Sequence, residues 1–138
     1  MSWLLYAFIS AAAAALTTIL AKVGVEGVPS NLATAIRTIV ITGFAWAIVA
    51  ARGEHRALTS LSRRSVVFLL LSGIATGVSW LAYFRALQLG PASRVSPIDK
   101  LSLPLTILLA VLFLHESVGW RLGLGVALMT VGAVLTIT

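Results

Sequence analysis

The sequence predicts an all-α integral membrane protein with five transmembrane helices. Of its 138 residues, 59% are hydrophobic and 10% are charged, whereas soluble globular domains have about 25% charged residues. The hydrophobic residues form five runs, each close to the roughly 20 residues that a helix needs to cross a bilayer. Short polar segments separate the runs, so that the five helices and their connections account for the whole chain.

The first three predicted helices are residues 3–21, 32–51 and 65–84. The first and the third contain no charged residue, and the second carries Arg37 near its start. The segment KVGVEGVPSN, which joins the first two, has the glycines and the proline of a turn. The longest polar segment, ARGEHRALTSLSRR, precedes the third predicted helix.

The last two predicted helices are residues 95–114 and 118–138, joined by the short HES link. The fourth follows a turn with the sequence QLGPASR. The fifth lacks the regularly spaced polar residues of the other four and contains several glycines instead. Glycines at a helix surface allow a neighbouring helix to approach closely, so we expect the fifth helix to serve packing.

Composition excludes several classes of protein. The chain has no cysteine, so it contains neither a disulfide nor a thiolate metal site. His55 and His115 lie in different predicted loops and are too few for a histidine metal site. No GxSxG, P-loop or HExxH motif is present. We therefore predict no enzyme, no metal and no cofactor.

The net charge of +6 indicates contact with membrane lipid and not with nucleic acid. The basic residues are scattered singly or in pairs between apolar runs, as expected for loop cations beside anionic headgroups. If Arg37 and Lys100 lie inside the membrane, the N-terminal side holds five basic residues (Arg52, Arg56, Arg63, Arg64 and Arg121) and the other side three (Lys22, Arg85 and Arg94). This difference predicts a cytoplasmic N-terminus, and its small size is compatible with insertion in both orientations.

The fourth predicted helix is interrupted near its start. Pro97, Asp99, Lys100 and Pro104 fall within about eight residues. Charged residues at bilayer depth cost a few kcal/mol each and usually face a cavity or a partner. Prolines there remove backbone donors that the surroundings must replace. Such an interrupted hydrophobic segment predicts a transport site, so we place the functional centre of the chain here.

Small or polar residues recur at helical spacing along the first four predicted helices. Steps of three and four residues place them on one helix face. They either line a substrate cavity or permit close helix packing. The candidate cavity residues of this kind are Ser10, Thr17, Thr76, Ser79, Ser96, Ser102 and Thr106. Trp80 and Tyr83, one turn apart, form either part of the interfacial aromatic belt or a stacking wall for an apolar or aromatic substrate.

Asp99 and Lys100 are neighbours in the sequence and do not face each other on a regular helix. We therefore expect each to have a different partner, with Arg37 as the candidate partner of Asp99. One interpretation is a structural salt bridge between the second and fourth helices. The other is functional: Asp99 couples transport to protons or pairs with a cationic group, while Lys100 or Arg37 holds an anionic group.

The segment from Tyr83 to Leu135, YFRALQLGPASRVSPIDKLSLPLTILLAVLFLHESVGWRLGLGVALMTVGAVL, resembles the C-terminal part of an EamA domain of the drug/metabolite transporter superfamily. The matching pattern is an Ala-Leu-x-x-Gly turn, a proline-containing fourth helix, an apolar run to Glu116 and a glycine-rich last helix. The segment AKVGVEGVPSNLATAIR is similar to the first helix hairpin of the family. The resemblance covers nearly the whole chain.

The resemblance implies one repeat of a transporter that is normally built from two inverted five-helix repeats. We therefore expect a half-size secondary transporter of small organic metabolites or drugs, working in a prokaryotic plasma membrane. It would act as an inverted or pseudo-symmetric dimer, either with itself or with a similar half-size subunit. The alternatives are a non-transporting assembly or regulatory subunit, or a component of a lipid-linked-sugar flippase. The acidic residue in the first helix of small multidrug resistance proteins has no match here.

Overall fold

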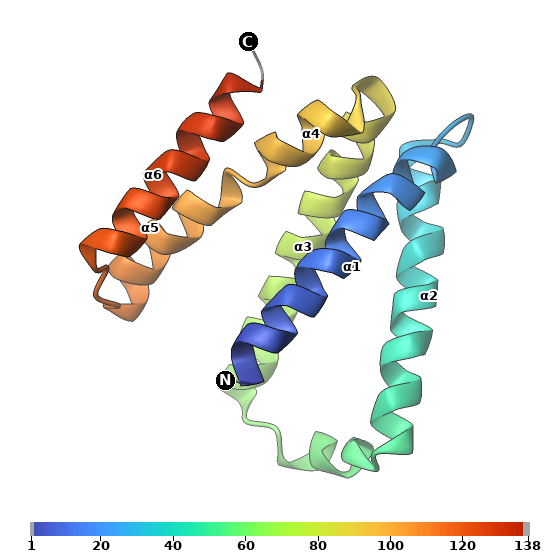
Figure 1. The fold of residues 1–138 in the computed structure, drawn as a ribbon. Coiled ribbons are helices and arrows are strands. Elements are labelled where there is room, and N and C mark those ends of the chain that lie inside the picture. The colour runs from blue at the N-terminus through green and yellow to red at the C-terminus, as the bar shows by residue number, and fades with distance from the viewer. Residues whose placement is uncertain (1, 137–138) are drawn as a thin grey trace. The chain divides into compact units, whose positions relative to one another are not determined.

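The computed structural model describes residues 2–136, which form six α-helices and one short 3₁₀ helix and contain no β-strand (Figure 1). In chain order the elements are α1 (Ser2–Gly24), α2 (Ser30–Ala51), η1 (Glu54–Ser60), α3 (Arg63–Leu89), α4 (Ala92–Asp99), α5 (Ser102–Leu114) and α6 (Trp120–Leu135). The all-helical fold class predicted from the sequence is therefore confirmed.

Four helical stretches are long and apolar enough to cross a membrane. They are Trp3–Gly24, Ser30–Ala51, Arg63–Leu89 and the combined α4–α5 stretch Ala92–Leu114. Helix α6 is also apolar but has only 16 residues. It begins later than the predicted fifth helix because Gly119 has an extended backbone, with φ −69° and ψ 152°. Positions 137 and 138 of that prediction lie outside the described residues.

The chain divides into two compact units, residues 20–89 and residues 1–19 with 90–138. In the first unit, the antiparallel helices α2 and α3 pack on each other, and η1 packs against α2. Val25, Phe84 and Leu87 are the large side chains with the least exposure in this unit. In the second unit, α6 packs against both α4 and α5, and Ala133 of α6 is buried.

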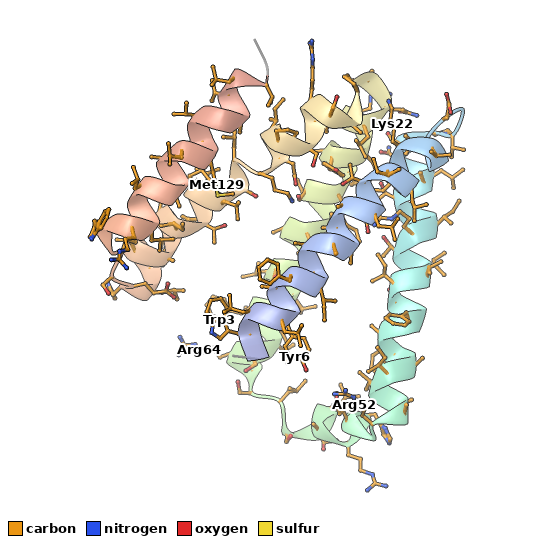
Figure 2. The ribbon with its side chains drawn as sticks, in the orientation of Figure 1. Trp3, Tyr6, Lys22, Arg52, Arg64 and Met129 are labelled. Carbon is orange, nitrogen blue, oxygen red and sulfur yellow. The ribbon has the colours of Figure 1, made fainter. Side chains whose placement is uncertain are left out.

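Basic side chains of the first unit lie at both ends of the α2–α3 pair (Figure 2). Lys22 marks one end, and Arg52 and Arg64 mark the other, where η1 connects the two helices. Arg52 also forms an exposed ion pair with Glu54, 3.8 Å between the charged atoms. Most large apolar side chains of the helices remain exposed. This distribution suits a bilayer, because lipid tails are as apolar as leucine and do not drive such side chains inward.

Helix α3 continues five residues past the end that the sequence predicted at Phe84. Arg85, taken as the first loop residue, lies inside the helix, because a charged side chain does not by itself end a helix. Pro91 provides the stop instead: a proline disfavours the α conformation in the residue before it, here Gly90. The extension places Arg85, Leu87 and Gln88 on the last turns of α3.

The fourth predicted helix is two helices in the structure. Helix α4 ends at Asp99, and α5 begins at Ser102, with a turn at Lys100 and Leu101. Pro104 has no N–H to donate to the Lys100 carbonyl, which accepts a hydrogen bond from the Leu103 N–H at 3.0 Å instead. Such tight bonds between residues three apart are typical of helix interruptions.

Candidate functional site

The turn between α4 and α5 brings two charged side chains together. Lys100 Nζ lies 3.5 Å from Asp99 Oδ2, and the two side chains are 51% and 37% exposed, respectively. The expectation that these two residues have different partners is therefore wrong. It assumed a regular helix, whereas Lys100 lies just beyond the end of α4, where its long side chain can fold back onto Asp99.

The remaining candidate residues of the α4–α5 stretch lie on both sides of this turn. Ser96 is half-buried in α4, next to Pro97, which is inside that helix. Ser102 is the first residue of α5, and the Thr106 hydroxyl donates to the Ser102 carbonyl at 2.8 Å. Ser102 and Thr106 are exposed. The stretch thus combines an ion pair, exposed hydroxyl groups and an interrupted backbone within one apolar span.

Arg37 of α2 belongs to the compact unit 20–89, and its side chain contacts two aromatic rings of α3. Its guanidinium carbon is 4.5 Å from the centre of the Phe84 ring and 5.2 Å from the centre of the Trp80 ring. Within residues 20–89, no carboxylate lies within 4.0 Å of it. Aromatic faces attract a cation through their quadrupole, so the two rings stabilise the charge that a carboxylate was expected to balance.

The contact of the Trp80 ring with Arg37 adds to the two interpretations of its sequence position, which stay predictions. Phe84, which the sequence analysis did not select, is 1% exposed and contributes the closer ring. Tyr83 is half-buried, and its ring meets that of Phe84 edge to face, at 6.3 Å between ring centres and 71° between planes. The periodic apolar pattern of α3 gave no reason to distinguish Phe84 from its neighbours.

The other candidate hydroxyl groups lie on α1 and α3. Thr76 of α3 is exposed and donates to the Ser72 carbonyl of its own helix at 2.9 Å. Ser79 is exposed on the same helix. In α1, Ser10 is exposed and Thr17 is half-buried. The Thr76 hydroxyl thus donates its proton within its own helix. It is nevertheless exposed, so a solute can still reach it.

A polar network at the end of the α2–α3 pair was missed from the sequence. The Lys22 ammonium donates to the Leu87 carbonyl at 2.6 Å. The Gln88 amide donates to the Val28 carbonyl at 2.6 Å and accepts a hydrogen bond from Arg85 at 2.9 Å. The sequence signal that could have revealed this network is Gln88, the one glutamine of the chain, which lies near the end of an apolar span.

Among residues 2–136, no group of three or more His, Asp or Glu side chains is placed to hold a metal ion. The polar groups at the candidate site are charged side chains, hydroxyl groups and backbone carbonyls.

Comparison with known proteins identifies the family. The model of the EamA-like transporter family matches residues 1–138. The chain is also 52% identical over 134 residues to a protein of Sinorhizobium sp. described as an uncharacterized transporter in the cobO 3′ region, a match that covers 97% of this chain and 95% of the relative. No solved structure matches the chain. The family model matches the chain over its whole length, and the four apolar spans agree with a multi-pass membrane protein. The chain therefore belongs to the EamA-like transporter family.

Proposed function

We propose that the chain is a half-size secondary transporter that moves small organic metabolites or drugs across the plasma membrane. The observation that carries this proposal is the interrupted span α4–α5, with the Asp99–Lys100 ion pair at its turn. A charged pair in an apolar span is costly unless water or a polar partner meets it. Both side chains are more than a third exposed in the single chain, so the chain itself does not cover them.

The helix interruption gives the site further binding groups. Half-helix ends and unwound backbone at membrane depth present partial charges and free hydrogen-bonding groups to transported solutes. The exposed Ser102 at the start of α5 extends this polar surface. We expect a solute with both polar and apolar parts to bind here, because the flanking residues of α5 are leucine, isoleucine and valine.

The proposal includes function as a dimer. By family resemblance a complete pathway requires two five-helix repeats, and the resemblance of this chain is to one of them. The Sinorhizobium relative, whose printed description calls it a transporter, is almost the same length, since the match covers 97% and 95% of the two chains. In this proposal a second copy or a similar subunit supplies the other half, and α6 forms the fifth span.

Reconstitution of the purified chain in liposomes tests the proposal. A library of labelled metabolites and drugs is screened for uptake with and without a proton gradient. We expect at least one compound to accumulate. Asp99→Asn should abolish its gradient-driven accumulation while leaving the folded protein intact, because the amide keeps the shape of the side chain but cannot carry a proton.

Glu116→Gln is the matched control, because it also neutralises one carboxylate but lies beyond the end of α5. It should transport at the rate of the unsubstituted chain. Equal accumulation by Asp99→Asn would remove the coupling role of Asp99. Failure of the folded protein to move any compound would favour the alternative, a non-transporting assembly or regulatory subunit.

A further inference from the structure

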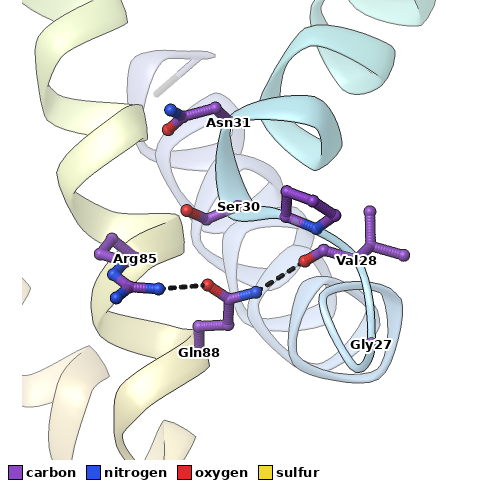
Figure 3. Close-up of a pocket in the computed structure, with 7 residues that line it drawn as sticks. Gly27, Val28, Ser30, Asn31, Arg85 and Gln88 are labelled. Carbon is purple, nitrogen blue, oxygen red and sulfur yellow. Dashed lines mark hydrogen bonds between the residues drawn. The ribbon is translucent and has the colours of Figure 1, made fainter.

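A second polar site lies at the end of the α2–α3 pair, within residues 20–89. A pocket of about 660 Å³ opens there, lined by Gly27, Val28, Pro29, Ser30, Asn31, Arg85 and Gln88 (Figure 3). All seven residues belong to the compact unit 20–89. We propose that this pocket binds a phosphate group, supplied either by a lipid headgroup or by a water-soluble solute.

The start of α2 forms one wall of the pocket. Ser30 and Asn31 are the first two residues of this 22-residue helix, and their side chains point toward α3 (Figure 3). The unpaired N–H groups and the dipole at a helix N-terminus attract anions. No acidic residue occupies the first turn of α2, so this partial positive charge is not already balanced by the helix itself.

Ser30 is the observation that points to a ligand. The residue is 7% exposed, yet its hydroxyl forms no hydrogen bond with the described part of the chain. Its backbone carbonyl, by contrast, accepts a hydrogen bond from Thr34. Buried hydroxyl groups normally have a partner. Among residues 2–136, every side-chain oxygen that is fully shielded from solvent has a hydrogen-bond partner. The Ser30 hydroxyl has no partner, so it is not fully shielded and must open onto the pocket that Ser30 lines.

Arg85 provides the full positive charge on the opposite wall. Its guanidinium donates to Gln88 Oε1, and the Gln88 amide nitrogen donates to the Val28 carbonyl (Figure 3). The amide has one possible orientation here, because arginine only donates and a carbonyl only accepts. Gln88 thus anchors Arg85 to the loop that forms the pocket floor. The guanidinium keeps donors for an oxyanion, which it can bind with two parallel hydrogen bonds.

The charges around the pocket favour an anion. Arg85 lines it directly. The nearest acidic residue in sequence, Glu26, lines an adjoining hollow of about 290 Å³, which shares Gly27 and Gln88 with the pocket and also contains Lys22, whose charge opposes that of Glu26. The pocket lies where α2 begins and α3 ends, which are the ends of two candidate spans. Lipid phosphates occupy that depth of a membrane. This placement does not depend on whether the chain transports a solute.

Two binding measurements on the full chain in neutral detergent test the proposal. Thermal unfolding is followed with increasing inorganic phosphate against chloride at equal ionic strength. Native mass spectrometry counts phosphatidylglycerol and phosphatidylcholine molecules retained by the chain. Stabilisation by inorganic phosphate identifies a water-soluble source, and selective retention of phospholipid without an effect of inorganic phosphate identifies the lipid source. Either result supports the site.

Three variants locate the binding. Arg85→Gln should weaken it at least tenfold, because the variant loses the charged donors that hydrogen-bond to the anion. Arg63→Gln, at the other end of α3, removes the same charge and should have no effect. Ser30→Ala should weaken binding several-fold, because it removes the buried hydroxyl.

Asn31→Asp tests whether the pocket binds an anion or whether its residues only stabilise the fold. An acidic residue in the first turn stabilises a helix, so the variant should fold at least as well as the unsubstituted chain. Its negative charge should nevertheless abolish phosphate binding. The proposal is overturned if neither phosphate nor phospholipid binds. It is also overturned if Asn31→Asp binds normally, or if Arg63→Gln weakens binding as much as Arg85→Gln.

Discussion

At the scale of single residues, the chain stabilises the cations of two candidate spans in different ways. Lys100 has a carboxylate partner 3.5 Å away. Arg37 instead lies over the rings of Phe84 and Trp80. A cation–π contact costs arginine less than it would cost lysine, because the guanidinium is planar and more weakly hydrated. The aromatic pair also leaves the N–H groups of Arg37 available for a hydrogen-bond acceptor.

The energy of the Arg37 contact can be measured by a double-mutant cycle with Arg37→Gln and Trp80→Leu. We expect a coupling free energy of about 0.5–2 kcal/mol, the range for partly desolvated cation–π pairs. Unfolding of the four proteins by denaturant in detergent measures it. The control pair is Arg64 and Phe68. The Arg64 guanidinium carbon lies 5.9 Å from the centre of the Phe68 ring, and Phe68 is 62% exposed. Coupling no larger than that of the control pair would contradict a stabilising role for the rings.

At the scale of elements, the interruption between α4 and α5 depends on the position of Pro104. As the third residue of α5, Pro104 is compatible with the first turn of a helix, where its missing N–H is not needed. It prevents α4 from continuing into α5, because the Lys100 carbonyl loses its regular donor. Lys100 and Leu101 themselves keep right-handed helical backbone angles. Only a small change therefore separates the interrupted helix from a continuous one.

Pro104→Ala should close the interruption and lower transport, because it restores the missing N–H donor. The chain has no cysteine, so spin labels at Ser93→Cys and Leu112→Cys can report the distance across the turn. A continuous helix places these positions about 28 Å apart, at 1.5 Å per residue. We expect the distance to lengthen toward this value and its distribution to narrow.

Pro97→Ala serves as the control for this measurement, because it restores a donor inside α4 and not across the turn. Its distance distribution should match that of the chain with both prolines. If Pro104→Ala leaves the distribution unchanged as well, the proline is not what separates α4 from α5.

The sequence predicts helices well here and contacts between helices less well. Apolar runs, with Pro97 and Pro104, indicate where spans lie and where one of them is disturbed, because these are local properties. The Arg37–Phe84 contact joins positions 47 residues apart, and helical periodicity does not give the rotation of α2 against α3. The Asp99–Lys100 ion pair was missed for a local reason, since a regular helix was assumed at its end.

At the scale of the whole molecule, both compact units carry residues of functional interest. The unit of residues 20–89 holds Arg37 on its aromatic rings and the proposed phosphate pocket. The unit of residues 1–19 and 90–138 holds the Asp99–Lys100 turn. Few large side chains are fully buried in the single chain. Its exposed apolar surface is therefore available to lipid and, in our proposal, to a second subunit.

The orientation predicted from the basic residues, with a cytoplasmic N-terminus, also belongs to this scale. A transporter that pairs as an inverted dimer of identical chains would insert in both directions. Impermeant reagents applied separately to right-side-out and inside-out vesicles distinguish one orientation from two.

The central claim is that water reaches the polar face of the α4–α5 span. Single cysteines at Thr106 and Leu108 test it most directly, because residues two apart lie about 200° apart around a helix at nearly the same depth. Both side chains are exposed in the single chain. A membrane-impermeant maleimide should label Thr106→Cys and leave Leu108→Cys unlabelled. Silence at both positions, or equal labelling at both, would contradict an aqueous path along this face.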